Sequence, residues 1–445
     1  MKINTDAKKI EALLSRGVEN VYPTKEFLEK ELKSGRQLTL YTGYDPTAPT
    51  LHIGHGITML KLRQFQDLGH KVIMLIGDFT GMIGDPTDKT SARQKLTKAQ
   101  VLENCKNYQK QASSILDFKS SNKVEVRYNS KWLGKLDFAD VLELASHFTV
   151  QQMLQRDMFK RRMSVSVICK SCGHLHNIVE PGINENEFEE SKGLVSVEFL
   201  CSKCNSKNKV TKNEIIQPKP IYLHEFMYPM MQGYDSVAMD VDGEIGGNDQ
   251  TFNMLVGRDL IKELKNKEKF VLTTKLLTDD TGKKMGKTEG NMIAFTDSAE
   301  DMFGKVMRWS DGVIKSGFEL CTTLPIEEIA DLVKLPNPRD AKFRLAYEVT
   351  KTFLGEEAAK KGQEHFTSVI QDKEKPADIT ELKPTSYDIV TVLVEGKLVT
   401  SKAEARRAIE QGGVKVDDVK VETIDAQVQK GSVVQKGKRF FVKVK

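Results

Sequence analysis

The sequence lacks a long apolar run, because no stretch of its 445 residues approaches the roughly 20 apolar residues that span a membrane. Its amino terminus, Met1 to Asn4, leads into charged residues without the apolar core of a signal peptide. We therefore expect a cytoplasmic protein without a membrane partner. With 39 % hydrophobic and 29 % charged residues the composition is globular, and the length predicts two to four domains.

The sequence also carries little net charge, +5 in all, but that charge is unevenly placed. Residues 386–445 hold 12 Lys or Arg against 8 Asp or Glu. A basic tail on a near-neutral body favours a polyanionic partner such as RNA, although a solvated basic surface explains the same composition.

Cysteine is scarce, and six cysteines in a chain of this length and kind do not indicate a disulfide framework. Cys105 and Cys321 stand alone and are expected to be buried. The other four form two C-x-x-C pairs separated by 28 residues. This spacing predicts a structural zinc site with four thiolate ligands, whereas the alternative is a loop with free thiols. The four predicted ligands are Cys169, Cys172, Cys201 and Cys204.

The first third of the chain predicts a parallel strand–helix–strand unit. Residues 37–42 form the expected first strand, which Gly43 and the loop 45–49 should end. A helix should follow through Gly69, and the apolar, β-rich run 71–76 is typical of a strand covered on both faces. The pattern predicts an α/β fold with a ligand crevice beyond the carboxyl ends of the strands.

Further along, residues 124–127 and 236–239 are predicted as later strands of the same sheet. The periodicity disappears between 164 and 218, which we interpret as an insertion. From 298 to about 371 the pattern is helical and charged, and 376–384 has the composition of a linker. In the tail, Ser401 and Glu404 form a capping box for a helix that Gly412-Gly413 should end.

His52-Ile53-Gly54-His55 lies where the first predicted strand gives way to a helix. Two imidazoles there can donate hydrogen bonds to phosphate oxygens, and the start of the helix offers unpaired N–H groups. Gly54 would let a nucleotide approach the backbone. A capping or core role is the alternative for so short a motif.

The loop Lys284 to Thr288 supplies ammonium groups between Gly282 and Gly290. Such a loop can close over a triphosphate and balance the charge of departing pyrophosphate, although lysine-rich loops are usually only solvated turns. Both motifs, in this order on one α/β chain, favour an ATP-consuming, adenylate-forming enzyme.

Together with these two motifs, several stretches resemble the bacterial-type tyrosyl-tRNA synthetases, which are class I aminoacyl-tRNA synthetases. They are Leu40 to Thr47, Thr80 to Pro86, Glu225 to Asp235 and Gly246 to Gln250. The resemblance covers nearly the whole chain apart from the insertion. It implies a Rossmann-like catalytic domain with a zinc-ribbon-like insertion, an α-helical domain and a small α+β RNA-binding domain at the carboxyl end.

The resemblance implies a site for L-tyrosine. Tyr41 and Asp235 match the pair that binds the phenolic hydroxyl, and Asp85, Tyr228 and Gln232 match the set that binds the ammonium. An anionic carboxylate and neutral acceptors suit an ammonium group, and a buried carboxylate disfavours a substrate without the hydroxyl. A plain helix face is the alternative for the residues at 228 and 232.

The resemblance also implies an ATP site with Mg²⁺ accompanying the nucleotide. No side chain acts as nucleophile, because the tyrosine carboxylate attacks the α-phosphate and the protein positions and neutralises charge. Six residues match the family's phosphate-handling set: Thr47, His52, His55, Lys89, Lys284 and Lys287. The nucleotide contacts would come from Gly43, Asp45, Gly54, Gly247, Asp249, Gln250 and Lys287.

The second implied step transfers tyrosine to the 3′ end of tRNA(Tyr), and the family further implies a homodimer. The tail from 386 resembles the RNA-binding domain of a small-ribosomal-subunit protein, with Lys402, Arg406, Arg407 and Lys415 as the predicted RNA contacts. The insertion could touch tRNA, stiffen a dimer or have no functional role. Thr42 and Glu244 stand where some members carry Cys and Gln, so their contacts stay open.

The predicted domains are therefore catalytic (1–296, interrupted by the zinc-binding insertion 164–218), α-helical (297–375), linker (376–385) and RNA-binding (386–445). Three other functions compete with tyrosine–tRNA ligation. They are a tRNA-independent adenylating enzyme, a catalytically dead RNA-binding relative and a tryptophan-specific synthetase.

Overall fold

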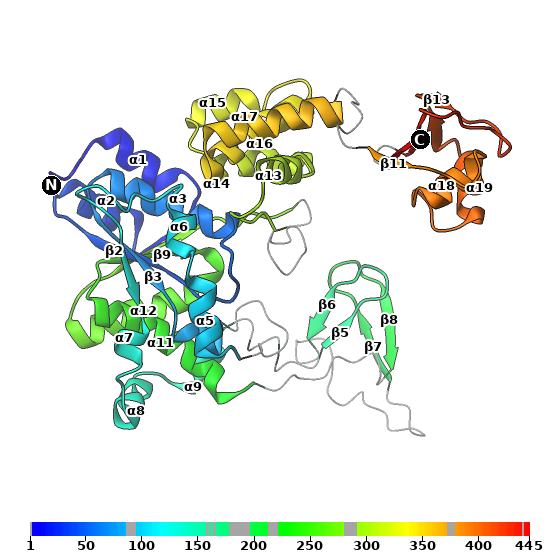
Figure 1. The fold of residues 1–445 in the computed structure, drawn as a ribbon. Coiled ribbons are helices and arrows are strands. Elements are labelled where there is room, and N and C mark those ends of the chain that lie inside the picture. The colour runs from blue at the N-terminus through cyan, green and yellow to red at the C-terminus, as the bar shows by residue number, and fades with distance from the viewer. Residues whose placement is uncertain are drawn as a thin grey trace. The chain divides into compact units, whose positions relative to one another are not determined.

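The computed structural model describes residues 2–85, 95–156, 159, 162, 166–177, 196–211, 221–279, 292–371, 379–437 and 440–445. The chain divides into two compact units, Met1–Ala359 and Lys360–Lys445 (Figure 1). Of the helices in the described residues, none is both long enough and apolar enough to cross a membrane.

The first unit is built on a six-stranded sheet with the strand order β1-β10-β9-β2-β3-β4. The strands are β1 (Val18–Tyr22), β2 (Thr39–Tyr44), β3 (Lys71–Ile76), β4 (Glu125–Tyr128), β9 (Gly243–Gly247) and β10 (Phe270–Thr274). Only the edge strand β1 is antiparallel to its neighbour; the other described pairings are parallel. The predicted α/β class and its parallel strand–helix–strand unit are confirmed.

Helices cover both faces of this sheet (Figure 1). Those of the α/β body are α1 (Ala7–Ser15), α2 (Lys25–Lys33), α3 (Ile53–Asp67), α4 (Thr80–Ile83), α5 (Lys98–Cys105), α6 (Tyr108–Ala112), α7 (Ser130–Leu133), α8 (Phe138–Ser146), α9 (Val150–Leu154), α11 (Leu223–Met239), the short η3 (Asn248–Gln250) and α12 (Thr251–Lys265). Because the strands β3 and β10 are buried along nearly their whole length, both faces of the sheet need such covers.

Two predictions about strands are wrong in detail. Residues 236–239 are the last turn of α11, not a strand, and Asp240 in the left-handed conformation (φ 50°) ends that helix. Their buried side chains continue the helical spacing that Met231 and Asp235 begin. The β-branched Val237 was interpreted as a strand signal, so the prediction from sequence missed this spacing. Gly43 does not end the first strand either, because β2 runs on to Tyr44 and keeps its pairing with β3.

The predicted helical stretch is confirmed over the described residues from 298 to 371. It contains α13 (Ala299–Met307), η5 (Asp311–Val313), α14 (Ile314–Cys321), α15 (Ile326–Leu332), α16 (Pro338–Leu354), α17 (Glu356–His365) and η6 (Phe366–Gln371). Arg16, directly after α1, donates to the backbone oxygens of Glu319 (2.9 Å) and Thr322 (2.6 Å) at the end of α14. This contact joins the helical stretch to the amino-terminal helix.

The second unit begins within α17, and its described residues from 379 onward form a five-stranded sheet and two helices around their own apolar core. Its elements are β11 (Thr380–Leu382), α18 (Ile389–Glu395), α19 (Lys402–Glu410), β12 (Val414–Val416), β13 (Val419–Lys420), β14 (Val433–Lys436) and β15 (Phe440–Val444). Ser401 caps α19 as predicted, accepting from the Glu404 N–H at 3.2 Å. The Glu404 carboxylate bonds the N–H of Thr400, one residue before the cap. Gly412, with φ 69°, follows the end of the helix.

Candidate functional site

The predicted phosphate motif forms the amino terminus of α3, directly beyond β2. His52 is the N-cap, and its Nδ1 accepts the Gly54 N–H at 3.1 Å. His55 Nδ1 accepts the His52 N–H at 3.2 Å, and the two rings stack with centroids 3.8 Å apart. Because both Nδ1 atoms are acceptors, we infer that each neutral ring carries its proton on Nε2, where it can serve as a donor. A Cβ at position 54 would lie 3.0 Å from the His52 ring, so a larger residue there would require the ring to shift.

The phenol end of the predicted tyrosine site is fully enclosed. Tyr41, on β2, is 0 % exposed, and Asp235, on α11, is 2 % exposed. Asp235 accepts hydrogen bonds from Trp132 Nε1 at 2.7 Å and from Asn129 Nδ2 at 3.3 Å. Burial raises the pKa of Asp235 well above its ordinary value, against these two donors. Burial, reinforced by the carboxylates of Glu244 and Asp235, likewise raises the pKa of Tyr41 and keeps its hydroxyl protonated.

Behind Tyr41 lies a buried ion pair that the sequence analysis did not identify. Lys269 directly precedes β10, is 0 % exposed, and its Nζ lies 2.5 Å from Oε2 of Glu244 on β9. The same Nζ donates to Ser236 Oγ at 2.7 Å, and Ser236 Oγ lies 3.0 Å from the Tyr41 hydroxyl. Burial lowers the pKa of Lys269, while the neighbouring Glu244 opposes that shift. Glu244, whose nucleotide and substrate contacts the sequence left open, contacts Lys269 within the protein.

A row of side-chain amides continues from Glu244 across the site. Gln232 Nε2 donates to Glu244 Oε1 at 3.1 Å, and Gln250 Nε2 donates to Asp85 Oδ2 at 2.7 Å. Asn253 lies between them, and its Nδ2 is 3.0 Å from the carbonyl oxygen of each glutamine. A carboxylate only accepts, so Glu244 and Asp85 fix which end of each glutamine faces them. Asn253 must therefore direct its NH₂ group toward both.

The far end of this row is another ion pair, since Arg156 Nη2 lies 2.9 Å from Asp85 Oδ1. Of the predicted ammonium-binding set, the structure thus brings Asp85 and Gln232 into one hydrogen-bonded row. The third member, Tyr228, donates its hydroxyl proton to Asp45 Oδ2 at 2.9 Å. Its phenolic oxygen therefore keeps lone pairs with which to accept from an ammonium group.

Asp45 and the remaining predicted nucleotide residues surround the carboxyl ends of β2 and β9. Asp45 follows β2 and accepts from the Thr80 hydroxyl at 2.7 Å and from Tyr228. Gly43 is exposed within β2, Thr47 is partly exposed, and Gly247 ends β9 two residues before Asp249. A Cβ at Gly247 would lie 2.5 Å from Asp249 Oδ1, so only glycine leaves that carboxylate its place. The predicted residues Lys89, Lys284 and Lys287 lie outside the described residues.

Sequence reasoning missed six residues of the phenol end and the amide row. They are Asn129, Trp132, Arg156, Ser236, Asn253 and Lys269. One signal was available for Asn253 and Ser236, because Asn253 lies three residues after Gln250 and Ser236 follows Asp235. Lys269 and Trp132 carry no such signal, since a lysine at the end of a charged run and an isolated tryptophan indicate no partner.

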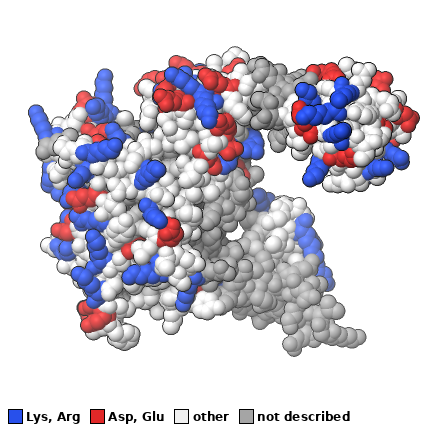
Figure 2. All heavy atoms as spheres, viewed as in Figure 1, with Lys and Arg blue, Asp and Glu red and all other residues white. Residues whose placement is uncertain are grey.

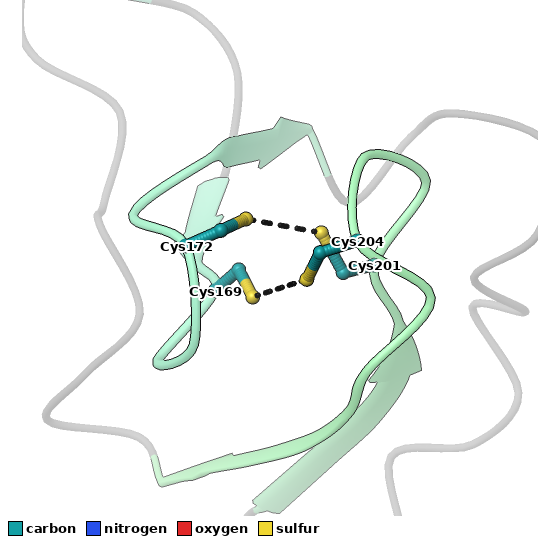
Figure 3. A group of neighbouring side chains, drawn as sticks. All are labelled: Cys169, Cys172, Cys201 and Cys204. Carbon is teal, nitrogen blue, oxygen red and sulfur yellow. Dashed lines mark hydrogen bonds between the residues drawn. The ribbon is translucent and has the colours of Figure 1, made fainter.

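The four predicted metal ligands come together between two small hairpins (Figure 3). The hairpins are β5 (Ser166–Ile168) with β6 (Leu175–Asn177), and β7 (Ser196–Leu200) with β8 (Lys207–Thr211). The four Sγ atoms lie within 4.8 Å of one another, and the pairs Cys169–Cys204 and Cys172–Cys201 are each 3.6 Å apart. A disulfide needs about 2.05 Å, so these thiols are not bonded to one another. Cys105 and Cys321 are buried, as predicted.

The predicted RNA contacts lie on the surface of the second unit. Lys402, Arg406 and Arg407 are exposed on α19, and Lys415 is exposed on β12. Figure 2 shows several Lys and Arg side chains together on one face of this unit. The helix and the strand thus present these cations to solvent from an ordered core.

Comparison with known proteins gives the family. A model of class I tRNA synthetases (W and Y) matches residues 33–171 and 185–371, and a model of the tyrosine–tRNA ligase SYY-like carboxyl-terminal domain matches 370–444. The curated tyrosine–tRNA ligase of Haemophilus ducreyi is 40 % identical over 448 residues, which cover 98 % of this chain and 99 % of that one. That of Thermotoga maritima is 39 % identical over 441 residues, covering 97 % and 96 %.

Solved structures agree on the fold. A truncated mitochondrial tyrosyl-tRNA synthetase of Aspergillus nidulans matches with a TM-score of 0.58 at 22 % identity, covering 81 % of this chain and 94 % of that one. The enzyme of Archaeoglobus fulgidus, solved with L-tyrosine, matches at 0.55 and 20 % identity, covering 80 % and 99 %. Sequence identity over the whole length and the shared fold lead to one conclusion: this chain belongs to the tyrosine–tRNA ligases, within the class I tRNA synthetases.

Proposed function

We propose that the protein charges tRNA(Tyr) in two steps at the site beyond β2 and β9. In the first, a carboxylate oxygen of L-tyrosine attacks the α-phosphorus of ATP, the bond to the bridging oxygen breaks, and Mg²⁺-pyrophosphate leaves. In the second, a hydroxyl of the terminal ribose of tRNA attacks the carbonyl carbon of the adenylate, and AMP leaves. Side chains position the reactants and balance charge in both steps.

The observation that carries this proposal is that Tyr41 and Asp235 are both buried and close enough for the Asp235 carboxylate to raise the pKa of Tyr41. A substrate phenol can donate its proton to the Asp235 carboxylate and accept from the Tyr41 hydroxyl. Phenylalanine has no hydroxyl to offer either group, and a buried polar group that lacks one of its hydrogen bonds costs about 1–3 kcal/mol. Tyrosyl-tRNA synthetases are themselves the standard example of an enzyme that rejects a substrate lacking one hydroxyl.

The other end of tyrosine would meet Asp85, Tyr228 and Gln232, whose oxygens accept from its ammonium group. On the nucleotide side, the Nε2–H groups of His52 and His55 would donate to phosphate oxygens at the start of α3. Asp249 would accept from ribose hydroxyls. Lys89, Lys284 and Lys287 complete the proposed phosphate set as counter-charges.

Tyrosine-dependent exchange of labelled pyrophosphate into ATP tests the first step. We expect exchange with tyrosine and far less with phenylalanine or tryptophan. Asp235→Asn should weaken the selectivity for tyrosine over phenylalanine, because an amide is uncharged and is a weaker acceptor than a carboxylate for the phenolic proton. Folded protein that shows no tyrosine-dependent exchange would contradict the proposal.

We also propose that the four cysteines bind one structural Zn²⁺ in a zinc-ribbon-like insertion. With Zn–S bonds of about 2.3 Å, a tetrahedral site places its sulfurs about 3.8 Å apart. The Sγ separations of 3.6 Å in the pairs Cys169–Cys204 and Cys172–Cys201 are close to this. A site closed by four thiolates leaves no open position, so the metal would stabilise the two hairpins and take no part in catalysis. Elemental analysis should give one zinc per chain, and less than half of that in Cys172→Ser.

We infer that the second unit binds tRNA by phosphate contacts from Lys402, Arg406, Arg407 and Lys415. The double variant Arg406→Ala/Arg407→Ala should raise the KM for tRNA without changing pyrophosphate exchange. The magnitude of the slope of log affinity for tRNA against log salt concentration should fall by about two. Lys430→Ala, at an exposed turn, is the matched control. Equal changes in the control would count against a specific surface on α19.

Two further assignments complete the proposal. The protein would act in the cytoplasm as a homodimer, and the exposed apolar side chains of Phe138 (77 %) and Val150 (65 %) are of the kind that such an interface buries. Sedimentation of the full chain tests the dimer. The proposed domain limits remain catalytic 1–296 around the insertion 164–218, helical 297–375, linker 376–385 and RNA-binding 386–445.

A further inference from the structure

The fully buried ammonium of Lys269 is costly unless other groups compensate its charge. Glu244 compensates that charge at 2.5 Å, yet two apolar side chains would fill the same space without a desolvation cost. The second group that Lys269 Nζ contacts is Ser236 Oγ, at 2.7 Å, and Lys269 Nζ also lies 5.8 Å from the centroid of the Tyr41 ring. The pair is therefore placed against the residue that would recognise the phenol.

Hydrogen-bond direction connects Lys269 to the Tyr41 hydroxyl. An ammonium group only donates, so Ser236 Oγ must accept from Lys269. Within the described part of the chain, the one further partner of Ser236 Oγ is the Tyr41 oxygen at 3.0 Å. Ser236 satisfies its own proton by donating to that oxygen. The phenolic proton of Tyr41 must then point to another acceptor, either the Glu244 carboxylate, which also interacts with this hydroxyl, or the phenol of a bound substrate.

We propose that Lys269, held by Glu244, is a positioning residue for phenol recognition that acts through Ser236 and sets the Tyr41 hydroxyl as a donor. The substrate phenol then accepts from Tyr41 and donates to Asp235, so each group has one assigned direction. This inference rests on the proposed function, because it gives further residues a role at the same tyrosine site. Lys269, Glu244 and Ser236 need not touch the substrate.

A purely structural role for the ion pair predicts a different outcome. If the pair only holds β9, β10 and α11 together, its loss should weaken the use of tyrosine and phenylalanine alike. If it sets the direction of the Tyr41 hydroxyl, its loss should act on tyrosine alone. The ratio of kcat/KM for the two amino acids therefore separates the two roles.

The test is pyrophosphate exchange by the full-length Ser236→Ala variant with tyrosine and with phenylalanine. We expect kcat/KM for tyrosine to fall about tenfold, chiefly through KM for tyrosine, which is the loss of about one buried hydrogen bond. The values for phenylalanine and for ATP should stay within twofold of wild type. Thr350→Val is the matched control, because it deletes a buried helical hydroxyl that bonds the Ala346 carbonyl of α16.

A second variant, Lys269→Met/Glu244→Gln, should lower the tyrosine to phenylalanine ratio by a similar factor. Adding Ser236→Ala to it should produce no further fall, since the three residues act through one hydroxyl. This inference alone would be overturned if wild type discriminates against phenylalanine and Ser236→Ala keeps the tyrosine to phenylalanine ratio of kcat/KM within twofold of wild type. Equal losses of kcat/KM for both amino acids in Ser236→Ala would have the same meaning. No tyrosine-dependent exchange by wild type would instead overturn the proposed function.

Discussion

Removing the buried cation Lys269 should strongly destabilise the first unit. In Lys269→Met the Glu244 carboxylate, 2 % exposed, loses its counter-ion and keeps the Gln232 amide. Leaving one charge of a buried pair uncompensated costs about 3–5 kcal/mol. Domains are stable by only about 5–15 kcal/mol, so this loss is a large share of the total.

The double variant Lys269→Met/Glu244→Gln should recover most of that loss. Glutamine can still accept from Gln232, because an amide offers a carbonyl oxygen where the carboxylate stood. We expect the double variant to be within about 2 kcal/mol of wild type, well below the sum of the two single losses, which is how a double-mutant cycle reveals that the two residues are coupled. Glu244→Gln alone should be destabilised, since it leaves the ammonium unbalanced.

Urea unfolding followed by tryptophan fluorescence measures this cycle in the appropriate unit. The chain has two tryptophans, Trp132 and Trp309, and both lie in the unit Met1–Ala359. The signal is therefore independent of the carboxyl-terminal unit, whose separate unfolding would otherwise mix two transitions. If the double variant is as unstable as the sum of the two single variants, the reasoning about charge compensation is refuted.

The remaining predictions concern His70 and Gly54. Burial lowers the pKa of His70 to about 4, so below pH 6.5 the unfolded chain binds a proton that the folded chain does not. The free energy of unfolding should therefore fall by up to about 3 kcal/mol as the pH drops from 6.5 to 4. His70→Asn keeps an acceptor but does not titrate, so the dependence of this free energy on pH should be flatter in that range. Gly54→Ala should displace the His52 ring and lower pyrophosphate exchange at least tenfold. Gly304→Ala is the control and should leave exchange unchanged, because its Cβ would have no atom within 4 Å. Equal exchange activity of the two variants would contradict a functional role for the close contact at His52.

The strand–helix–strand unit could be predicted because its signals are local. The run 71–76 is apolar after its first residue, Lys71, and the observed β3 has the same limits. The capped helix after Ser401 was predictable for the same reason. Strand β9 was not, because Gly-Glu-Ile-Gly-Gly has a poor β composition and becomes a strand only between two strands that pair with it.

The motifs of the candidate site could be found in sequence, but its supporting contacts could not. Tyr41 and Asp235 follow from resemblance, whereas Trp132 lies 103 residues from Asp235 and still donates to it. Lys269 lies 33 residues from Ser236, after an intervening strand and helix. Such pairs depend on strand order in the sheet, and no periodicity along the chain encodes that order.

The charges around the phenol explain why Lys269 matters beyond its contact with Glu244. Asp235 has no ion pair within 4 Å in the described part of the chain; its donors are the neutral Trp132 and Asn129. Lys269 nevertheless interacts with Asp235 over a longer distance, and each group favours the charged form of the other. One cation therefore serves two carboxylates, Glu244 by contact and Asp235 through space.

Replacing the pair by Met and Gln keeps the formal charge of these three positions at −1, since one cation and one anion leave together. A change in tyrosine selectivity in that variant then cannot come from net charge. It must come from the lost direction of the hydroxyl relay through Ser236 and from the lost position of the positive charge beside Asp235. Both effects act on the phenol, which is why the ion pair belongs to recognition as well as to stability.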